Sequence, residues 1–147
     1  MKKIFFIPVI SFFIFSCSST KSFDREHELN VFLKENDIDT AKTEKKYVVI
    51  IQSNPCNSCF LQLFDNVKKY LEKEYVEKDI IFSTNNQEII QDAKLLNNAT
   101  VMYDSLHRLA PLGLAFSNLV IKYNKGKIIN WAEISYDNLK YIRKMIR

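Results

Sequence analysis

The chain has 147 residues, of which 47% are apolar and 26% are charged, a composition that indicates one folded domain and excludes a disordered or collagen-like chain. Its 21 Lys and Arg exceed its 17 Asp and Glu by a formal net charge of +4, spread along the chain, which argues against nucleic acid as a partner. Its two glycines, Gly113 and Gly126, permit neither GxxxxGK nor GxGxxG, so phosphate-binding loops of these two kinds are excluded.

Hydrophobic patterning predicts a helix followed by a strand at the start of the domain. Apolar residues on one face predict a short helix over residues 24–35, capped by Asp24, and the polar residues 36–46 form a connection. The continuous, mostly β-branched run at 47–51 predicts a strand that is buried on both faces.

Two helices with a strand between them are predicted next. The first begins at or just after Cys56, and its apolar residues recur at helical spacing: Phe60, Leu63, Phe64, Val67 and Leu71. Residues 79–84 then predict a second buried strand, and the apolar residues of 89–96 predict another helix.

The last third of the domain is predicted to be mostly β-structure. Residues 100–103 read as a short strand and 106–116 as a loop whose leucines pack partly against the core. A hairpin follows over 119–131, closed by a three-residue turn at 124–126 with Gly126 in the left-handed position, and a helix begins near Tyr136.

This order of elements predicts an α/β fold. The alternating first half implies parallel strands joined by a helical crossover, and the final hairpin adds antiparallel strands to the same sheet. We therefore expect a mixed β-sheet with helices on both faces.

The first seventeen residues have the form of a secretory leader. Lys2 and Lys3 precede an apolar run at 4–15 that is shorter than the roughly 20 residues a membrane-spanning helix needs. The segment Ile14-Phe15-Ser16-Cys17 resembles a bacterial lipobox. This resemblance implies that 1–17 is a lipoprotein signal peptide ending at a lipidated Cys17, that 18–23 is a tether and that the domain spans 24–147.

Cys56-Asn57-Ser58-Cys59 lies where a strand passes into a helix. The unpaired N–H groups and the positive dipole end of a helix N-terminus favour a thiolate, so we expect the pKa of the Cys56 thiol to lie below that of a free cysteine. Cys56 would attack a substrate disulfide, and Cys59, close by but more buried, would resolve the mixed disulfide. This chemistry needs no metal and no organic cofactor.

Three segments of the chain resemble the thioredoxin-like family. The first, YVVIIQSNPCNSCFLQLF, resembles its strand, CxxC and first active-site helix, and SNLVIKYNKGKIINW resembles its later hairpin. With the intervening IIFSTNNQEIIQDAKLLNNATVMYD, the resemblance spans about residues 45–146 and is closest to membrane-tethered extracytoplasmic thiol-disulfide oxidoreductases. It implies a thioredoxin-like fold, catalytic Cys56 and Cys59, and substrate contacts from the neighbouring residues Pro55, Asn57, Ser58, Phe116 and Ser117.

Three positions differ from the pattern of that family. Ser117 stands where the family usually has a cis-proline, and because a cis peptide before serine costs about 3 kcal/mol, a trans loop is expected there. Pro55 replaces an aromatic residue before the first cysteine. Ile50 occupies the place of a buried acid, which leaves no evident proton acceptor near Cys59.

Two other interpretations of the cysteines remain open. The pair could form a static disulfide in a thioredoxin-like lipoprotein that acts as a binding module. Alternatively, His107 could join the pair in copper binding, as in thioredoxin-like copper chaperones, although those have CxxxC spacing and His107 has the setting of a solvated loop residue. Three cysteines cannot supply the four ligands of a structural zinc site.

The expected partners follow from this chemistry. We expect protein thiols or disulfides as partners, a membrane held through the lipid on Cys17, and no nucleic acid. The protein is expected to be a monomer in the cell envelope, facing outside the cytoplasm.

Overall fold

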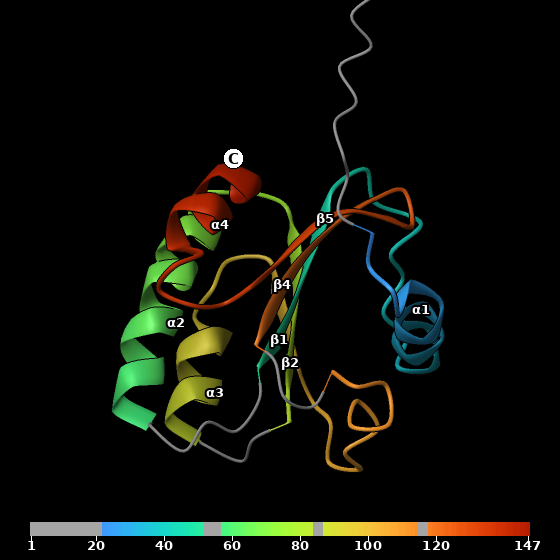
Figure 1. Ribbon diagram of the computed structural model, residues 1–147, viewed down its shortest axis with the longest axis horizontal. Coiled ribbons are helices and arrows are strands. Elements are labelled where there is room, and N and C mark those ends of the chain that lie inside the picture. Colours follow the sequence, from blue (N-terminus) through green and yellow to red (C-terminus); the bar gives the residue numbers. More distant parts are fainter. Residues whose placement is uncertain (1–21, 52–56, 84–86, 115–117) are drawn as a thin grey trace, which may run out of the picture.

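The computed structural model describes residues 22–51, 57–83, 87–114 and 118–147, with the backbone alone for 57, 58, 87–89 and 92. In chain order these residues form α1 (Glu26–Glu35), β1 (Lys46–Ile51), α2 (Asn57–Leu71), β2 (Glu77–Phe82), α3 (Gln87–Lys94), β3 (Ala99–Tyr103), β4 (Leu119–Asn124), β5 (Lys127–Glu133) and α4 (Leu139–Ile146) (Figure 1).

The five strands form one mixed sheet in the order β3-β2-β1-β4-β5. Strand β1 is central, and it pairs in parallel with β2 and antiparallel with β4. Strand β3 extends the parallel side, and β5 extends the antiparallel side. The carboxyl ends of β1, β2 and β3 therefore share one edge of the sheet, and α2 starts from that edge, after β1.

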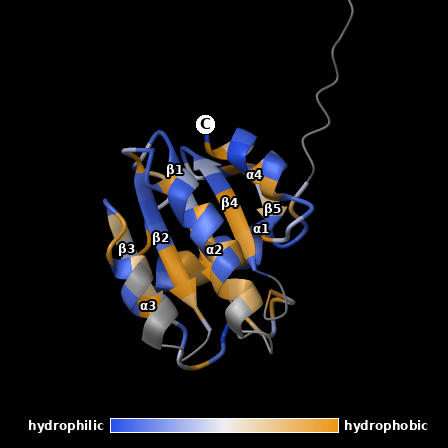
Figure 2. Cartoon of the chain, turned by 90° about the vertical axis from the view of Figure 1, so that its left-hand side faces the viewer, coloured by the Kyte–Doolittle hydropathy of each residue, from blue (hydrophilic) through white to orange (hydrophobic). Residues whose placement is uncertain are grey.

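Alternation along β1 divides the core between the two faces of the sheet. Val48 and Ile50 pack in a cluster with α1, whereas Tyr47, Val49 and Ile51 pack in a cluster with α2, α3 and α4. Figure 1 shows these three helices on one side of the sheet and α1 on the other. Stripes of hydrophilic and hydrophobic residues alternate on α2 and α4 (Figure 2), as helices with one buried face require.

The expected fold class is confirmed. The sheet is mixed, helices cover both faces, and a parallel βαβ half precedes an antiparallel hairpin and a last helix, which is the thioredoxin-like arrangement. The apolar residues expected to bury α2, from Phe60 to Leu71, are all buried. All six residues of β1 are buried as well, as the apolar run predicted for most of them.

Two local predictions are wrong. Helix α1 starts at Glu26 with Arg25 as its N-cap residue and no side-chain cap, so Asp24 does not cap it. The hairpin closes with two residues instead of three, because Asn124 pairs with Lys127. Lys125 and Gly126 have φ of 47° and 79°, the pair of positive values that a tight type I′ turn requires.

Buried charges form a further part of the interior. The Lys46 ammonium lies 2.8 Å from the Asp79 carboxylate, and both side chains are less than one tenth exposed. Burial raises the pKa of Asp79, an effect that Lys46 partly offsets. Lys78, which is 1% exposed, donates to three backbone carbonyls, those of Glu74, Val76 and Asn97. It thereby joins the connection after α2 to the one before β3.

Candidate functional site

The first turn of α2 is held firmly against the end of the sheet. Phe60 stacks on Phe64 with ring centroids 6.3 Å apart, and Phe64 meets Phe82 of β2 edge to face at 6.5 Å. All three rings are buried. Because Phe60 follows Cys59 directly, this aromatic packing fixes the backbone that carries the second cysteine.

Cys59 is exposed in the first turn of α2. Its backbone carbonyl accepts a hydrogen bond from the hydroxyl of Tyr136 at 3.2 Å. Tyr136 lies in the connection between β5 and α4, so this bond ties the end of the hairpin to the start of α2. Cys59 was expected to be more buried than Cys56; its side chain is exposed, and because Cys56 lies outside the described residues the comparison between the two is not tested.

The charges on α2 agree with its dipole. Its first turn carries no acidic residue, and its last turn carries Lys68 and Lys69. The helix begins at the residue after Cys56, and no carboxylate in its first turn neutralises the positive end of its dipole. An anionic sulfur would be stabilised at this end.

Most of the predicted site residues lie outside the described residues. These are Cys17, Pro55, Cys56, Phe116 and Ser117, so neither the roles assigned to them nor the expected trans loop at Ser117 is tested. Asn57 and Ser58 are the first two residues of α2, with no described side chain. Cys59 is thus the predicted site residue whose side chain the structure places.

A buried carboxylate that sequence reasoning missed shapes the loop after β3. Asp104 is 3% exposed, and its two oxygens accept hydrogen bonds from the backbone N–H groups of Arg108, at 3.1 Å, and Leu109, at 2.9 Å. Its own N–H donates to the carbonyl of Phe82. The loop that leads toward Phe116 is therefore attached to the carboxyl edge of the sheet. The signal in the sequence was an Asp directly after a predicted strand, a common start of a turn.

The same loop is attached to α1 through Arg108. Its guanidinium donates to the side chain of Asn36 at 2.5 Å, lies 3.5 Å from the Glu35 carboxylate and stands over the ring of Phe32 at 5.2 Å. Leu109 and Leu114 bury their side chains beside α1, as the leucines of this loop predicted. On the far side of Ser117, the Asn118 carbonyl accepts from the N–H of Ile134 at 2.7 Å.

Metal binding finds no support among the residues that the structure describes. They contain no group of three His, Cys, Asp or Glu side chains arranged to hold an ion. His107 is an exposed loop residue with φ of 51°, as the sequence indicated. Since Cys56 lies outside these residues, the copper interpretation with His107 is not tested. No helix in the described part of the chain is long and apolar enough to cross a membrane.

Comparisons with known proteins add little. No protein-family model and no curated protein matches the chain. Among solved structures it is similar to a peroxiredoxin-like protein from Aquifex aeolicus, with 15% sequence identity and a TM-score of 0.48 over 73% of this chain and 74% of that chain. At this level the likeness supports no statement about activity, and the assignment of the fold rests on strand order and connectivity.

Proposed function

We propose that the protein is a thiol-disulfide oxidoreductase that works through Cys56 and Cys59. The supporting observation is the place of Cys59, exposed in the first turn of a helix that starts directly after Cys56 and the central strand. Disulfides that hold a fold together usually resist reduction, whereas exposed ones are the labile and catalytic ones. The exposure of Cys59 therefore favours thiol-disulfide exchange over a structural disulfide in a binding module.

The proposed reaction is a two-step exchange. The Cys56 thiolate attacks one sulfur of a substrate disulfide, forms a mixed disulfide and expels the other substrate sulfur as a thiolate. The Cys59 thiolate then attacks the Cys56 sulfur, forms the Cys56–Cys59 disulfide and releases the second substrate thiol. The substrate gains the two electrons that the protein loses, and the reverse sequence oxidises a substrate dithiol.

The helix explains why the two cysteines take different roles. Cys56 precedes the first helical residue, where N–H groups without intrahelical partners stabilise a thiolate. Cys59 lies within the first turn, three residues further along. The position where the resembled family places a buried acid is occupied by Ile50, which is fully buried. Protons would therefore pass directly between sulfur and water at the exposed Cys59.

Alkylation of the reduced protein tests this division of roles. With limiting iodoacetamide near neutral pH, Cys56 should react first and faster than glutathione, as peptide mass spectrometry can follow. Cys59→Ser should trap mixed disulfides with protein substrates in cells, and Cys56→Ser should trap none. Equal labelling of both cysteines, together with no trapped species, would instead support the binding module.

We further propose that the chain is a lipoprotein held on a membrane through Cys17. The support is the short apolar run with two leading lysines and the Ile14-Phe15-Ser16-Cys17 segment directly after it. Mass spectrometry of membrane fractions should find Cys17 as an acylated N-terminus. An unmodified N-terminus at Met1 would contradict the anchor without touching the redox proposal.

A further inference from the structure

The charged residues on the outer face of α4 are all basic. Between Leu139 and Arg147 the sequence has no acidic residue. The helix buries Ile142, Met145 and Ile146 against the sheet, while its exposed positions lie one and two turns apart on the opposite face. These exposed positions are Lys140, Tyr141, Arg143, Lys144 and Arg147.

A fifth positive charge on this surface comes from Lys73, two residues beyond the end of helix α2. The end of this helix packs beside the end of α4, and Lys73 lines a shallow depression together with Arg143 and Arg147. Glu74 also lines it, but its carboxylate is paired with Lys45 at 2.8 Å. Lys73, Lys140, Arg143, Lys144 and Arg147 together are named the basic face. Three exposed acids lie close to it, Glu72 and Asp137 along the chain and Glu133 in the depression that Tyr141 lines, and they are fewer than its five cations.

The described chain begins close to this helix. The ring of Phe23 meets Trp131 of β5 edge to face at 5.4 Å. Trp131 and Tyr141 line one depression, and the Tyr141 hydroxyl donates to the side chain of Asn130 at 2.6 Å. Phe23 is therefore connected to α4 through β5, and the start of the described chain and α4 lie toward the same end of the molecule (Figure 1).

Sequence length limits how far a lipid on Cys17 could lie from this point. Five residue steps separate Cys17 from Ser22, so a fully extended chain spans at most about 18 Å. In physiological salt charges interact over about 8 Å, so α4 would be attracted to an anionic bilayer once it lies within about that distance of the headgroups. Lipid anchors are commonly supported by such a second, basic signal.

We propose that the basic face docks on the anionic headgroups of the membrane that holds Cys17. This inference rests on the proposed lipid anchor and does not depend on the redox proposal. Cys59 lies twelve residues before Leu71 on α2, about 18 Å along the helix from the end that carries the basic face. Docking would therefore present the cysteines away from the bilayer, toward soluble protein substrates.

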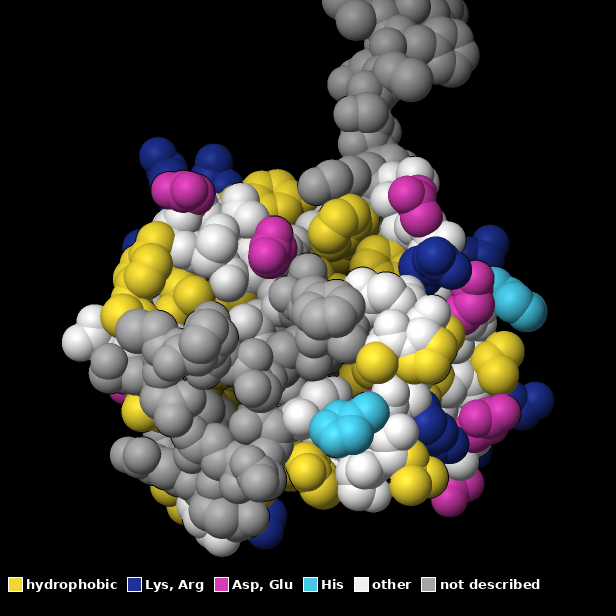
Figure 3. Space-filling model, turned by 60° about the horizontal axis from the view of Figure 1, so that its bottom comes forward, with side chains coloured by type: hydrophobic (Ala, Val, Ile, Leu, Met, Phe, Trp, Pro, Cys, Tyr) yellow, Lys and Arg dark blue, Asp and Glu magenta, His cyan; other side chains and the backbone are white. Residues whose placement is uncertain are grey.

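The opposite end of the molecule differs in its charges. Figure 3 turns the end with the start of α2 toward the viewer, and among the residues it describes Lys and Arg are interspersed with Asp and Glu. Two lysines outside the basic face, Lys34 in the last turn of α1 and Lys94 in the last turn of α3, are exposed and serve as controls, irrespective of the end at which they lie. They match two basic-face residues in charge and exposure.

The test uses the full lipidated chain reconstituted in vesicles of phosphatidylcholine, with or without phosphatidylglycerol. An amine-reactive reagent should label Lys140 and Lys144 several-fold more slowly on the vesicles with phosphatidylglycerol, and high salt should abolish this protection. Lys34 and Lys94 should label equally on both. Equal labelling of Lys140 and Lys144 on both vesicles, or equal protection of Lys34 and Lys94, would overturn the proposal.

Charge reversal gives a second test. Each basic residue near an anionic surface strengthens association about fivefold, so Arg143→Glu with Lys144→Glu should remove the protection of Lys140. The matched pair Lys34→Glu with Lys94→Glu should retain it. Protection by an acidic protein or by nucleic acid, with none by anionic vesicles, would overturn the membrane as partner. A chain that carries no lipid overturns the anchor and the docking together, whereas an inactive CxxC in a detergent exchange assay overturns only the redox proposal.

Discussion

Replacing Asp104 by alanine should destabilise the protein strongly, because one buried and one half-buried N–H group lose their acceptor. The Asp104 carboxylate is 3% exposed and accepts from Arg108 N at 3.1 Å and Leu109 N at 2.9 Å. A buried polar group left without a partner costs about 1 to 3 kcal/mol, so Asp104→Ala should lower the free energy of unfolding by about 3 kcal/mol. With a urea dependence of roughly 1.5 kcal/mol per molar, the unfolding midpoint should fall by about 2 M.

A matched control exists elsewhere in the chain. Asp39 makes the same kind of contact, since its Oδ1 accepts from the N–H groups of Ala41 at 2.8 Å and Lys42 at 3.3 Å, but its side chain is exposed. Water can replace this carboxylate, so Asp39→Ala should shift the midpoint far less. Asp104→Asn, which keeps the shape and one acceptor oxygen, should fall between the wild type and Asp104→Ala.

The measurement is urea unfolding followed by circular dichroism for all four proteins. Equal midpoint shifts for Asp104→Ala and Asp39→Ala would refute the reasoning, because burial is what distinguishes the two carboxylates. An unchanged midpoint for Asp104→Ala would mean that other acceptors reach the two N–H groups when the loop relaxes.

Three further predictions concern the core, a buried charge and a turn. Tyr47→Phe removes a hydroxyl that donates to the Ile146 carbonyl at 2.7 Å, so urea unfolding should show a loss of about 1 kcal/mol. Burial raises the pKa of Asp79, so the folded chain binds more protons than the unfolded chain, and this group lowers the free energy of unfolding as pH rises from about 4 through its folded pKa. Asp79→Asn removes this pH dependence. The free energy of unfolding of the variant, measured with urea, should therefore rise relative to that of the wild type as the pH increases from about 3 to 7. Lys125→Asn, at φ of 47° before Gly126, should raise Tm by about 2 °C in calorimetry.

Each of these three has a result that contradicts it. Tyr75→Phe, at a side chain 88% exposed, should change nothing, and an equal loss in both tyrosine variants would remove the role of the buried hydroxyl. Parallel pH profiles for the wild type and Asp79→Asn would contradict the burial of that carboxyl. A lower Tm in Lys125→Asn would mean that the 3.8 Å pair of Lys125 with Glu44 contributes more than the turn does.

The elements with a strong burial signal could be predicted from the sequence. Residues 47–51 of β1 form a continuous apolar run, and α2 repeats its apolar residues at helical spacing. Burial of both faces of β1 and of one face of α2 could therefore be predicted from the sequence. The turn at Lys125 could not be settled this way. Asn-Lys-Gly can close a hairpin with two or three residues, and the choice follows from the register in which β4 meets β1 and β5.

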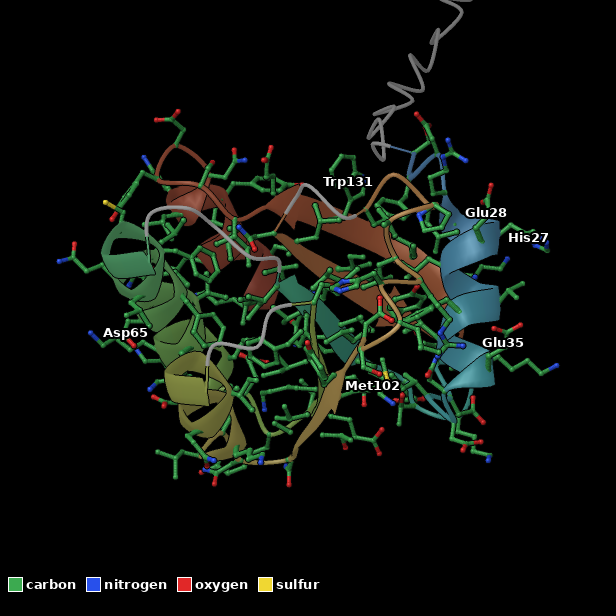
Figure 4. The ribbon with its side chains drawn as sticks, turned by 90° about the horizontal axis from the view of Figure 1, so that it is seen from below. His27, Glu28, Glu35, Asp65, Met102 and Trp131 are labelled. Atoms are coloured by element: carbon green, nitrogen blue, oxygen red, sulfur yellow. The ribbon has the colours of Figure 1, made fainter. Side chains whose placement is uncertain are left out.

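Polar residues whose partners are backbone groups escaped prediction. Lys78 and Asp104 are visible in the sequence, but the carbonyls and N–H groups that satisfy them are brought together only by the folded chain. The same holds for Tyr136, which reaches the carbonyl of Cys59 across 77 positions. The apolar faces of α1 and α2 could be predicted from the sequence, and polar side chains project from the rest of each helix. His27, Glu28 and Glu35 point outward from α1, and Asp65 points outward from α2 (Figure 4).

The candidate site was predicted as a CxxC motif between a strand and a helix, and the structure describes one of its side chains, that of Cys59. The spacing of Cys56 and Cys59 and the start of the helix follow from local sequence, and α2 begins where the prediction put it. The exposure of Cys59 does not follow from local sequence. It depends on the packing of Phe60, whose ring is buried in the core while the side chain of the preceding residue, Cys59, lies at the surface.

The reduction potential of the Cys56–Cys59 couple tests the central claim most directly. The full chain would be equilibrated in glutathione and dithiothreitol buffers, and the fraction of disulfide would be measured by thiol alkylation and mass spectrometry. An exchanger should titrate between about −270 and −120 mV. A potential below about −300 mV, typical of a structural disulfide, would contradict the account and support a static bond in a binding module.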